Sequence, residues 1–133
     1  KIYGDKERIA QVITNLISNA IKYSPASCDI IITSSVTNTH VTLCVEDCGV
    51  GISKDHQAKV FERFYRVSGP KENSFPGLGL GLYISQEIIK RQGGRIWVES
   101  EKGKGSTFCF TLPLDYRMAL DQLKISNPEI NDV

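Results

Sequence analysis

The segment at residues 5–23 constrains the fold most, because its pattern predicts a long amphipathic helix whose apolar face must be buried. Asp5 is a good N-cap, and Ser24-Pro25 ends the helix because a residue before proline avoids helical dihedrals. Apolar side chains recur at helical spacing and make one face: Ile9, Val12, Ile13, Leu16, Ile17, Ala20 and Ile21.

Four β-rich segments follow the helix and carry further apolar residues. Segments 28–36 and 40–47 form a first pair, and the link at 37–39 suits a hairpin. Segments 95–101 and 105–112 form a second pair, joined by a glycine-containing turn. Alternate side chains place apolar residues on one face of this second pair: Ile96, Val98, Phe108, Phe110 and Leu112.

The remaining segments are shorter or irregular. A short helical piece is expected within residues 55–65, and a second helix at 79–92 stops at Gly93-Gly94. Residues 68–77 have no periodicity and many breakers, which is typical of a lid or binding loop inside a compact domain.

Length and composition describe one ordinary domain, which we place at residues 1–113, with a tail or linker at 114–133. Apolar residues make up 41% and charged residues 23% of the chain, as in globular proteins generally. A formal net charge of +1 argues against a nucleic-acid partner that is bound through phosphate neutralisation. No apolar run approaches the roughly 20 residues of a membrane span, and no signal peptide is visible. We therefore expect a cytoplasmic domain without direct membrane contact, monomeric in isolation, although a longer parent protein could be membrane-anchored.

The cysteines suggest no site of their own. They are Cys28, Cys44, Cys48 and Cys109. None lies in a CxxC pair, and only His40 and His56 could join them in a zinc site of unusual spacing. We expect reduced, half-buried thiols on strands.

Three polar residues share one side of the first helix. Asn15, Asn19 and Lys22 fall at i, i+4 and i+7, off the apolar stripe. Two amides and an ammonium suit Mg²⁺ and phosphate oxygens. Taken alone, a solvated polar face is the simpler interpretation.

Glycine clusters mark three turns. Asp47-x-Gly49-x-Gly51 follows a strand, where glycines permit close approach of a flat ligand and a carboxylate could accept a hydrogen bond from an exocyclic amine. Residues 77–82, Gly-Leu-Gly-Leu-Gly-Leu, open the second helix and could offer amides to phosphates. No strand directly precedes them, so a dinucleotide fingerprint is rejected. Residues 103–107 are expected to form a hairpin turn, and a role in binding a ligand is secondary. Ordinary turn or packing roles remain open for each cluster alone.

The order of these patterns resembles the ATP-binding catalytic domain of sensor histidine kinases, over about residues 1–113. Five boxes in succession carry the resemblance: Asn15 to Asn19, Asp47 to Gly51, Phe61 to Arg66, Gly77 to Leu82, and Gly103 to Thr107. The resemblance implies the α/β Bergerat ATP-binding fold, a two-layer sandwich. Its mixed, mostly antiparallel sheet has helices on one face and a mobile ATP lid.

The resemblance also implies roles at the phosphate end of bound Mg-ATP. Asn19 would bind Mg²⁺, Asn15 and Lys22 would lie near the phosphates, and Arg66 would contact the γ-phosphate. The catalytic residues that the resemblance implies are Asn15, Lys22 and Arg66. The glycine box would cradle the phosphates through Gly77, Leu78, Gly79, Leu80, Gly81 and Leu82.

At the adenine end, Asp47 is implied to hold the exocyclic amine and Tyr23 to pack on the ring, with Thr107 helping from the last strand. The residues that would shape this pocket are Gly49, Gly51 and Ile52. Two positions depart from the family. Cys48 replaces an asparagine whose amide often fixes this turn, and Leu78 replaces a small hydroxyl residue.

The implied function is a two-component phosphorelay, in which the domain presents ATP to a histidine on an upstream dimerisation domain, and the phosphoryl group then passes to a response regulator receiver domain. Neither His40 nor His56 is followed by the Glu or Asp expected after the acceptor histidine, so the chain should not label itself. An ATP hydrolase would need Glu where Asn15 stands, since an amide is no general base. A degenerate, non-enzymatic nucleotide-binding platform is the alternative.

Overall fold

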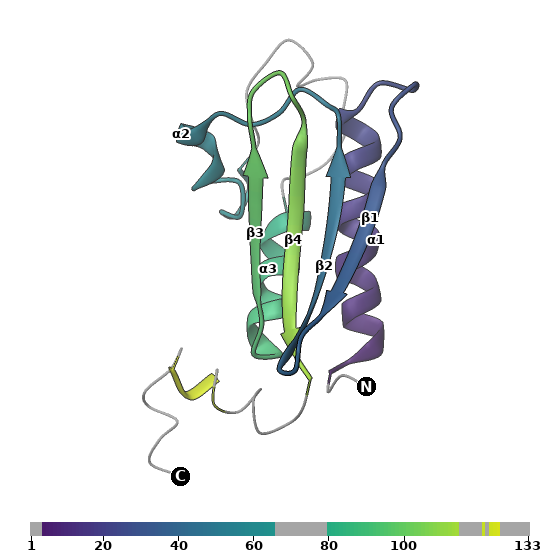
Figure 1. Cartoon of the computed structure of the whole chain (residues 1–133). Coiled ribbons are helices and arrows are strands. Elements are labelled where there is room, and N and C mark those ends of the chain that lie inside the picture. Colours follow the sequence, from purple (N-terminus) through teal and green to yellow (C-terminus); the bar gives the residue numbers. More distant parts are fainter. Residues whose placement is uncertain (1–3, 66–79, 115–120, 122, 126–133) are drawn as a thin grey trace.

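One antiparallel sheet with two helices on one face makes up the fold. Figure 1 shows this arrangement in the computed structural model, which describes residues 4–65, 80–114, 121 and 123–125. The strands are β1 (Ile31–Val36), β2 (His40–Asp47), β3 (Arg95–Ser100) and β4 (Ser106–Pro113), in the order β1-β2-β4-β3. The helices are α1 (Lys6–Tyr23), the short α2 (Lys54–Gln57) and α3 (Gly81–Arg91). The two-layer α/β architecture expected from the sequence is therefore confirmed.

Helix α1 forms where its cap and its apolar stripe predict it. The Asp5 carboxylate accepts hydrogen bonds from the backbone N–H groups of Glu7 (3.1 Å) and Arg8 (3.2 Å), which otherwise have no partner in the first turn. Val12, Leu16 and Ala20 are buried, and Ile9, Ile13 and Ile17 pack beside them. Ile21 is the exception, since 60% of its surface is exposed. Its inclusion in the apolar face that packs on the sheet was wrong, because Ile21, in the last turn of α1, does not reach the core.

The core lies between the sheet and the helices. Alternate residues of β2, β3 and β4 point at α1 and α3 and are buried: Val45, Ile96, Phe108, Phe110 and Leu112. Strand β1 is the sheet edge, where every residue is exposed. The layer that carries the site is thus β2 and β4, flanked by both long helices.

Several sequence-based boundaries need adjustment. The helical piece expected within 55–65 is limited to α2, and turns follow it. The described strands pair only in antiparallel fashion, so the mixed pairing we expected is not seen in this part of the chain. The irregular segment 68–77 and most of the tail lie outside the described residues. No helix in the described part is long and apolar enough to cross a membrane.

The cysteines correct a second expectation, because the structure pairs all four in disulfides instead of leaving reduced thiols. Cys44 and Cys109 stand directly opposite each other in the β2–β4 register, with Cα atoms 4.1 Å apart. Cys28, in the loop after α1, reaches Cys48 at the end of β2, with Cα atoms 6.0 Å apart. Spacing along the chain could not predict either pair, because each depends on strand register or on loop folding.

We expect Leu16→Ala to lower the free energy of unfolding by about 2–5 kcal/mol, because it leaves a cavity where the side chain is 1% exposed. The matched control is Ile21→Ala, on the same helix at an exposed position, with an expected change within about 0.5 kcal/mol. Urea denaturation of both variants measures the difference. Equal losses would contradict the placement of the core.

Candidate functional site

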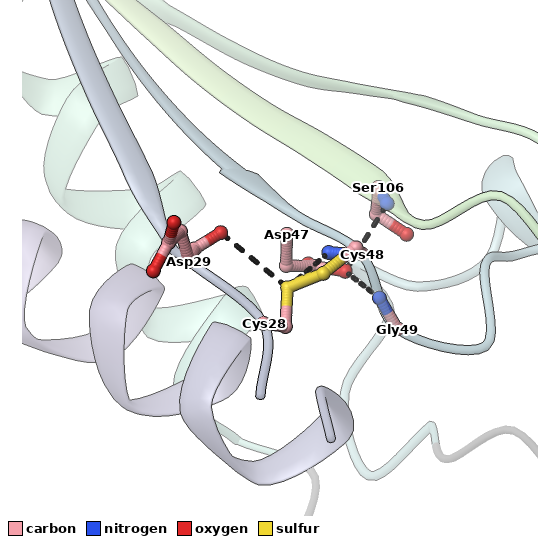
Figure 2. Close-up of a disulfide and its surroundings, with 6 residues drawn as sticks. All are labelled: Cys28, Asp29, Asp47, Cys48, Gly49 and Ser106. Carbon is pink, nitrogen blue, oxygen red and sulfur yellow. Dashed lines mark hydrogen bonds between the residues drawn. A yellow bond between two sulfur atoms is a disulfide. The ribbon is translucent and has the colours of Figure 1, made fainter. Parts of the chain in front are cut away.

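The carboxylate of Asp47 is the best-defined polar feature of the site. Asp47 ends β2 and points toward the helix layer, as Val45 does two residues earlier, and it is only 8% exposed. Its Oδ1 accepts hydrogen bonds from the backbone N–H of Gly49 (2.9 Å) and of Ser106 (3.2 Å), as Figure 2 shows. Within the described residues, Oδ2 accepts none. One carboxylate oxygen is therefore fixed by the fold, and the other can accept a hydrogen bond from a ligand.

The turn after Asp47 is tied to the β3–β4 hairpin by a small polar network. Ile52 N donates to the Ser100 hydroxyl (2.7 Å), and that hydroxyl donates to the Gly105 carbonyl (2.8 Å). The Gln57 amide donates to the carbonyls of Ile52 (2.7 Å) and Ser100 (2.8 Å). These bonds satisfy half-buried polar groups, so they position the turn at low cost. Ser100 and Gln57 had not been expected to support the site.

Two glycines let the hairpin approach the turn closely. Gly105 has φ +90°, and a Cβ there would lie 2.1 Å from the Asp47 carbonyl oxygen. Gly51 has φ +71°, and a Cβ would lie 2.1 Å from the Glu101 carbonyl oxygen. Any side chain at either position would push the two backbone segments apart. Glycine is therefore required at both positions, because of this close contact and because of the positive φ angle.

Asn15 joins the two long helices at the other side of the site. Its Nδ2 donates to the Ser85 hydroxyl (3.2 Å), which is fully buried, and more weakly to the Gly81 carbonyl (3.4 Å). Leu80 precedes α3 and gives no side-chain cap to its first turn. A Cβ on Gly81 would meet nothing within 4 Å. Within the described residues, which exclude 66–79, the N-terminus of α3 therefore has uncapped amides and no atom close to Gly81, as an anion site requires.

The end of α1 borders the Asp47 turn. A Cβ on Gly49 would lie 2.2 Å from the Tyr23 carbonyl oxygen, so the two backbones touch. Tyr23 is 38% exposed, and Lys22 is exposed in the last helical turn. Asn19 is half-buried one turn after Asn15. Within the described residues, no hydrogen bond or ion pair engages the side chains of Asn19 or Lys22.

The structure brings most of the predicted residues to one end of the sheet, where α1, the Asp47 turn and the start of α3 are placed. Four predicted residues lie outside the described part of the chain: Arg66, Gly77, Leu78 and Gly79. Of the two phenylalanines of the third box, Phe61 packs edge-on against Phe108 at 6.2 Å. Phe64 is 63% exposed, so it does not pack in this way.

Thr107 lies on the last strand, β4, but on the face opposite to that of Asp47. Strand alternation points Thr107 away from the helix layer, whereas Asp47 and its partner Ser106 point toward that layer. Ser106 is 7% exposed, and its hydroxyl lies 2.8 Å from that of Ser100. Ser106 was not among the residues predicted for the site. The alternation with buried Phe108 and Phe110 could have identified it, because Ser106 shares their parity.

We expect Gly105→Ala to destabilise the fold more than Gly103→Ala does. Gly103 has a similar φ of +88°, but a Cβ there meets nothing within 4 Å. The control variant Gly103→Ala therefore measures only the free-energy cost of placing a non-glycine residue at positive φ, roughly 1–2 kcal/mol. Gly105→Ala adds the clash with the Asp47 carbonyl, so we expect a further loss above about 1 kcal/mol in chemical denaturation. Equal losses would contradict the close contact.

Comparison with known proteins gives the family. Residues 4–116 match the family described as histidine kinase-, DNA gyrase B-, and HSP90-like ATPase. The sensor histidine kinase WalK of Bacillus subtilis (strain 168) is 44% identical over 111 residues, which are 82% of this chain and 18% of WalK. The sensor protein SrrB of Staphylococcus aureus (strain NCTC 8325 / PS 47) is 43% identical over 109 residues, which are 82% of this chain and 19% of SrrB. The chain thus spans about a fifth of the length of these relatives.

Solved structures agree. The mycobacterial sensor histidine kinase MprB aligns with a TM-score of 0.77 at 28% identity, covering 84% of this chain and 76% of that one. The catalytic domain of the histidine kinase ThkA aligns at 0.73 with 34% identity, covering 85% and 71%. Full-length ShkA, solved in complex with AMPPNP, aligns at 0.73 with 31% identity, covering 84% and 22%. None of these matches supports a degenerate platform. The chain belongs to the histidine kinase-, DNA gyrase B- and HSP90-like ATPase family, as a catalytic domain of the sensor histidine kinase type.

Proposed function

We propose that this chain binds Mg-ATP at the end of β2 and presents its γ-phosphoryl group to a histidine on a separate, upstream dimerisation domain. The observation that carries the proposal is the buried carboxylate of Asp47, with Oδ1 held by two backbone amides and Oδ2 available to a ligand. A carboxylate fixed in this way can recognise a donor such as the exocyclic amine of adenine.

The adenine ring would lie over the turn that follows Asp47. Gly49, Gly51 and Ile52 bring backbone close to a flat ligand, and Tyr23 ends α1 against the same turn. We propose Ser106 as the hydroxyl residue of this pocket, in place of Thr107, because Ser106 lies on the same side of the sheet as Asp47 and its backbone N–H already donates to the Asp47 carboxylate.

The phosphates would lie toward the start of α3. Leu80, Gly81 and Leu82 open this helix, and its uncapped amides carry the positive end of the helix dipole. Lys22 adds positive charge from α1. We propose Arg66 and the preceding box residues Gly77, Leu78 and Gly79 as further phosphate contacts, on the basis of the sequence boxes alone.

Asn19 fits the magnesium ion that would accompany ATP. Its amide oxygen is a hard ligand on the polar side of α1, and Mg²⁺ usually takes one or two protein oxygens beside those of the phosphates. When bound, the ion would neutralise phosphate charge and favour phosphoryl transfer. Within the described residues there is no cluster of three acidic, histidine or cysteine side chains that could hold a metal by themselves.

Asn15 favours transfer to another protein over hydrolysis. Its amide cannot take a proton from water at neutral pH, and its Nδ2 is already engaged with Ser85 and Gly81. Asn15 therefore holds the start of α3 in position near the phosphates. Lys22 and Arg66 would stabilise the charge on the transferred group.

The partners follow from this chemistry. The phosphoryl group would pass from the histidine of the dimerisation domain to a response regulator receiver domain, in a cytoplasmic phosphorelay. We also propose that residues 1–113 form the catalytic unit and that residues 114–133 are a tail or linker. We propose that the isolated unit is a monomer.

We expect Asp47→Ala to weaken binding of Mg-ATP by at least about tenfold, because a charged acceptor contributes roughly 1.5–3 kcal/mol to a hydrogen bond. Isothermal titration calorimetry measures the dissociation constant, and circular dichroism checks the fold. The matched control is Glu46→Ala, at the neighbouring exposed residue on the opposite face, which should keep wild-type affinity. Full affinity of Asp47→Ala would refute the adenine assignment.

We expect the wild-type chain alone to release phosphate from Mg-ATP slowly and to remain unlabelled, because Asn15 stands where a general base would be needed and neither His40 nor His56 is followed by Glu or Asp. A phosphate-release assay and radiolabelled ATP measure the two properties. Addition of a histidine-bearing dimerisation domain should lead to label on that domain. Rapid phosphate release without it would contradict the proposal.

A further inference from the structure

A disulfide lies beside the Asp47 turn of the site described above. Cys28 lies in the loop between α1 and β1, and Cys48 directly follows Asp47 (Figure 2). Their Cα atoms are 6.0 Å apart, within the range that a disulfide spans without backbone movement. The bond therefore connects the segment that follows α1 to the turn that carries the Asp47 carboxylate.

We infer that Cys28 and Cys48 form a reversible redox site whose closure raises the affinity of the domain for nucleotide. The inference rests on the proposed function, because the affinity concerned is that of the Asp47 pocket. In the cytoplasm, disulfides are rare and, where they form, are usually transient and redox-sensing or catalytic. A disulfide placed beside a ligand-binding carboxylate is therefore in a position to report redox state.

Both redox forms fit the same backbone. In the thiol form, the S–H of Cys28 can donate to the carbonyl oxygen of Asp29, 3.4 Å from the sulfur. The backbone N–H of Cys48 lies 3.1 Å from the same sulfur and can donate to it. Opening the bond thus leaves no buried donor or acceptor without a partner, and Cys48 is exposed to thiol reagents.

The second disulfide differs from the first in its exposure to solvent and in its effect on the Asp47 turn. Cys109 is 4% exposed, and Cys44 faces it across neighbouring strands whose hydrogen bonds already hold the pair together. The Cα separation of 4.1 Å is close to the ~4.5 Å of narrow antiparallel pairs. Opening or closing this bond should leave the Asp47 turn unchanged, so Cys44 and Cys109 can be replaced without altering the inferred redox site.

Closure should tighten binding because it fixes a turn that glycines leave loose. Gly49 and Gly51 flank Val50 immediately after Cys48, and Gly49 touches the backbone of Tyr23 at the end of α1. When the disulfide is open, only packing and the hydrogen bond from the Cys48 N–H to the Cys28 sulfur hold the two segments together. When it is closed, the loop after α1 and the turn are covalently held together, and less ordering has to accompany nucleotide binding.

The chemistry needs only a low-molecular-weight disulfide as oxidant. The exposed Cys48 thiolate attacks one sulfur of that reagent, which forms a mixed disulfide and releases one thiolate. The Cys28 thiolate then attacks the Cys48 sulfur and releases the second thiolate. Two electrons pass to the reagent, and the two protons lost by the cysteines are taken up by the released thiolates. An excess of reducing thiol reverses both steps.

The test uses the Cys44→Ser/Cys109→Ser chain, which retains only the inferred redox pair, and compares its own two forms. The chain is equilibrated with reduced or with oxidised glutathione, peptide mass spectrometry identifies the Cys28–Cys48 link, and calorimetry gives the dissociation constant of Mg-ATP. We expect about three- to tenfold tighter binding in the linked form. Adding Cys28→Ser should remove the redox dependence, while circular dichroism should stay unchanged.

The outcomes separate this inference from the proposed function. Equal affinity of the two forms, with the link verified in one of them, would overturn the redox inference and leave ATP binding intact. Failure of the link to form under oxidised glutathione would also overturn it. Loss of ATP binding in both forms of the wild-type chain would instead contradict the proposed function itself. Because both forms come from one chain, the comparison does not depend on the folding of the Cys28→Ser variant.

Discussion

The hydrogen bonds from Gly49 N and Ser106 N to Asp47 Oδ1 are the contacts on which the site depends. They connect the end of β2, the turn that follows it and the first residue of β4 through one nearly buried carboxylate. A charged acceptor in such a place is costly unless donors satisfy it, and these two amides do so. The same bonds leave Oδ2 as the outward acceptor. The Asp47 side chain therefore holds the turn and can also recognise the ligand by accepting a hydrogen bond from it.

The rest of the architecture positions that carboxylate against two helices. The apolar face of α1 packs on β2 and against α3, which brings its C-terminal turn to Gly49. Asn15 then connects α1 to the first turn of α3, where the amides are uncapped. An acceptor for an amine and a donor set for anions thus lie at the same end of the sheet. A ligand that carries an amine at one end and anionic groups at the other, such as a purine nucleotide, matches this arrangement.

The sequence predicted much of this because the fold is built from strong local signals. The Asp5 cap, the helical spacing of Val12 and Leu16, and the alternation of Phe108 and Phe110 are each determined within a few residues, and the structure confirms them. The ordered boxes predicted the family, which the comparisons confirm. The assigned roles of individual site residues stay predictions.

What the sequence could not predict depends on contacts between distant segments. The pairing of Cys44 with Cys109 follows from strand register, and that of Cys28 with Cys48 follows from how the loop after α1 folds. The support that Ser100 and Gln57 give to the turn is likewise non-local. Ser106 was missed for a different reason, since the face on which a residue of β4 lies changes with every position along the strand.

The most direct test of the central claim compares ATP with inosine triphosphate, which carries a carbonyl in place of the exocyclic amine. Competition binding to the wild-type chain measures the preference. If Asp47 Oδ2 accepts the amine, ATP should bind at least about tenfold more tightly. Asp47→Asn, which can present a donor instead, should reduce that preference. Equal affinity of the wild-type chain for the two nucleotides would contradict the assignment of Asp47 as the residue that recognises adenine.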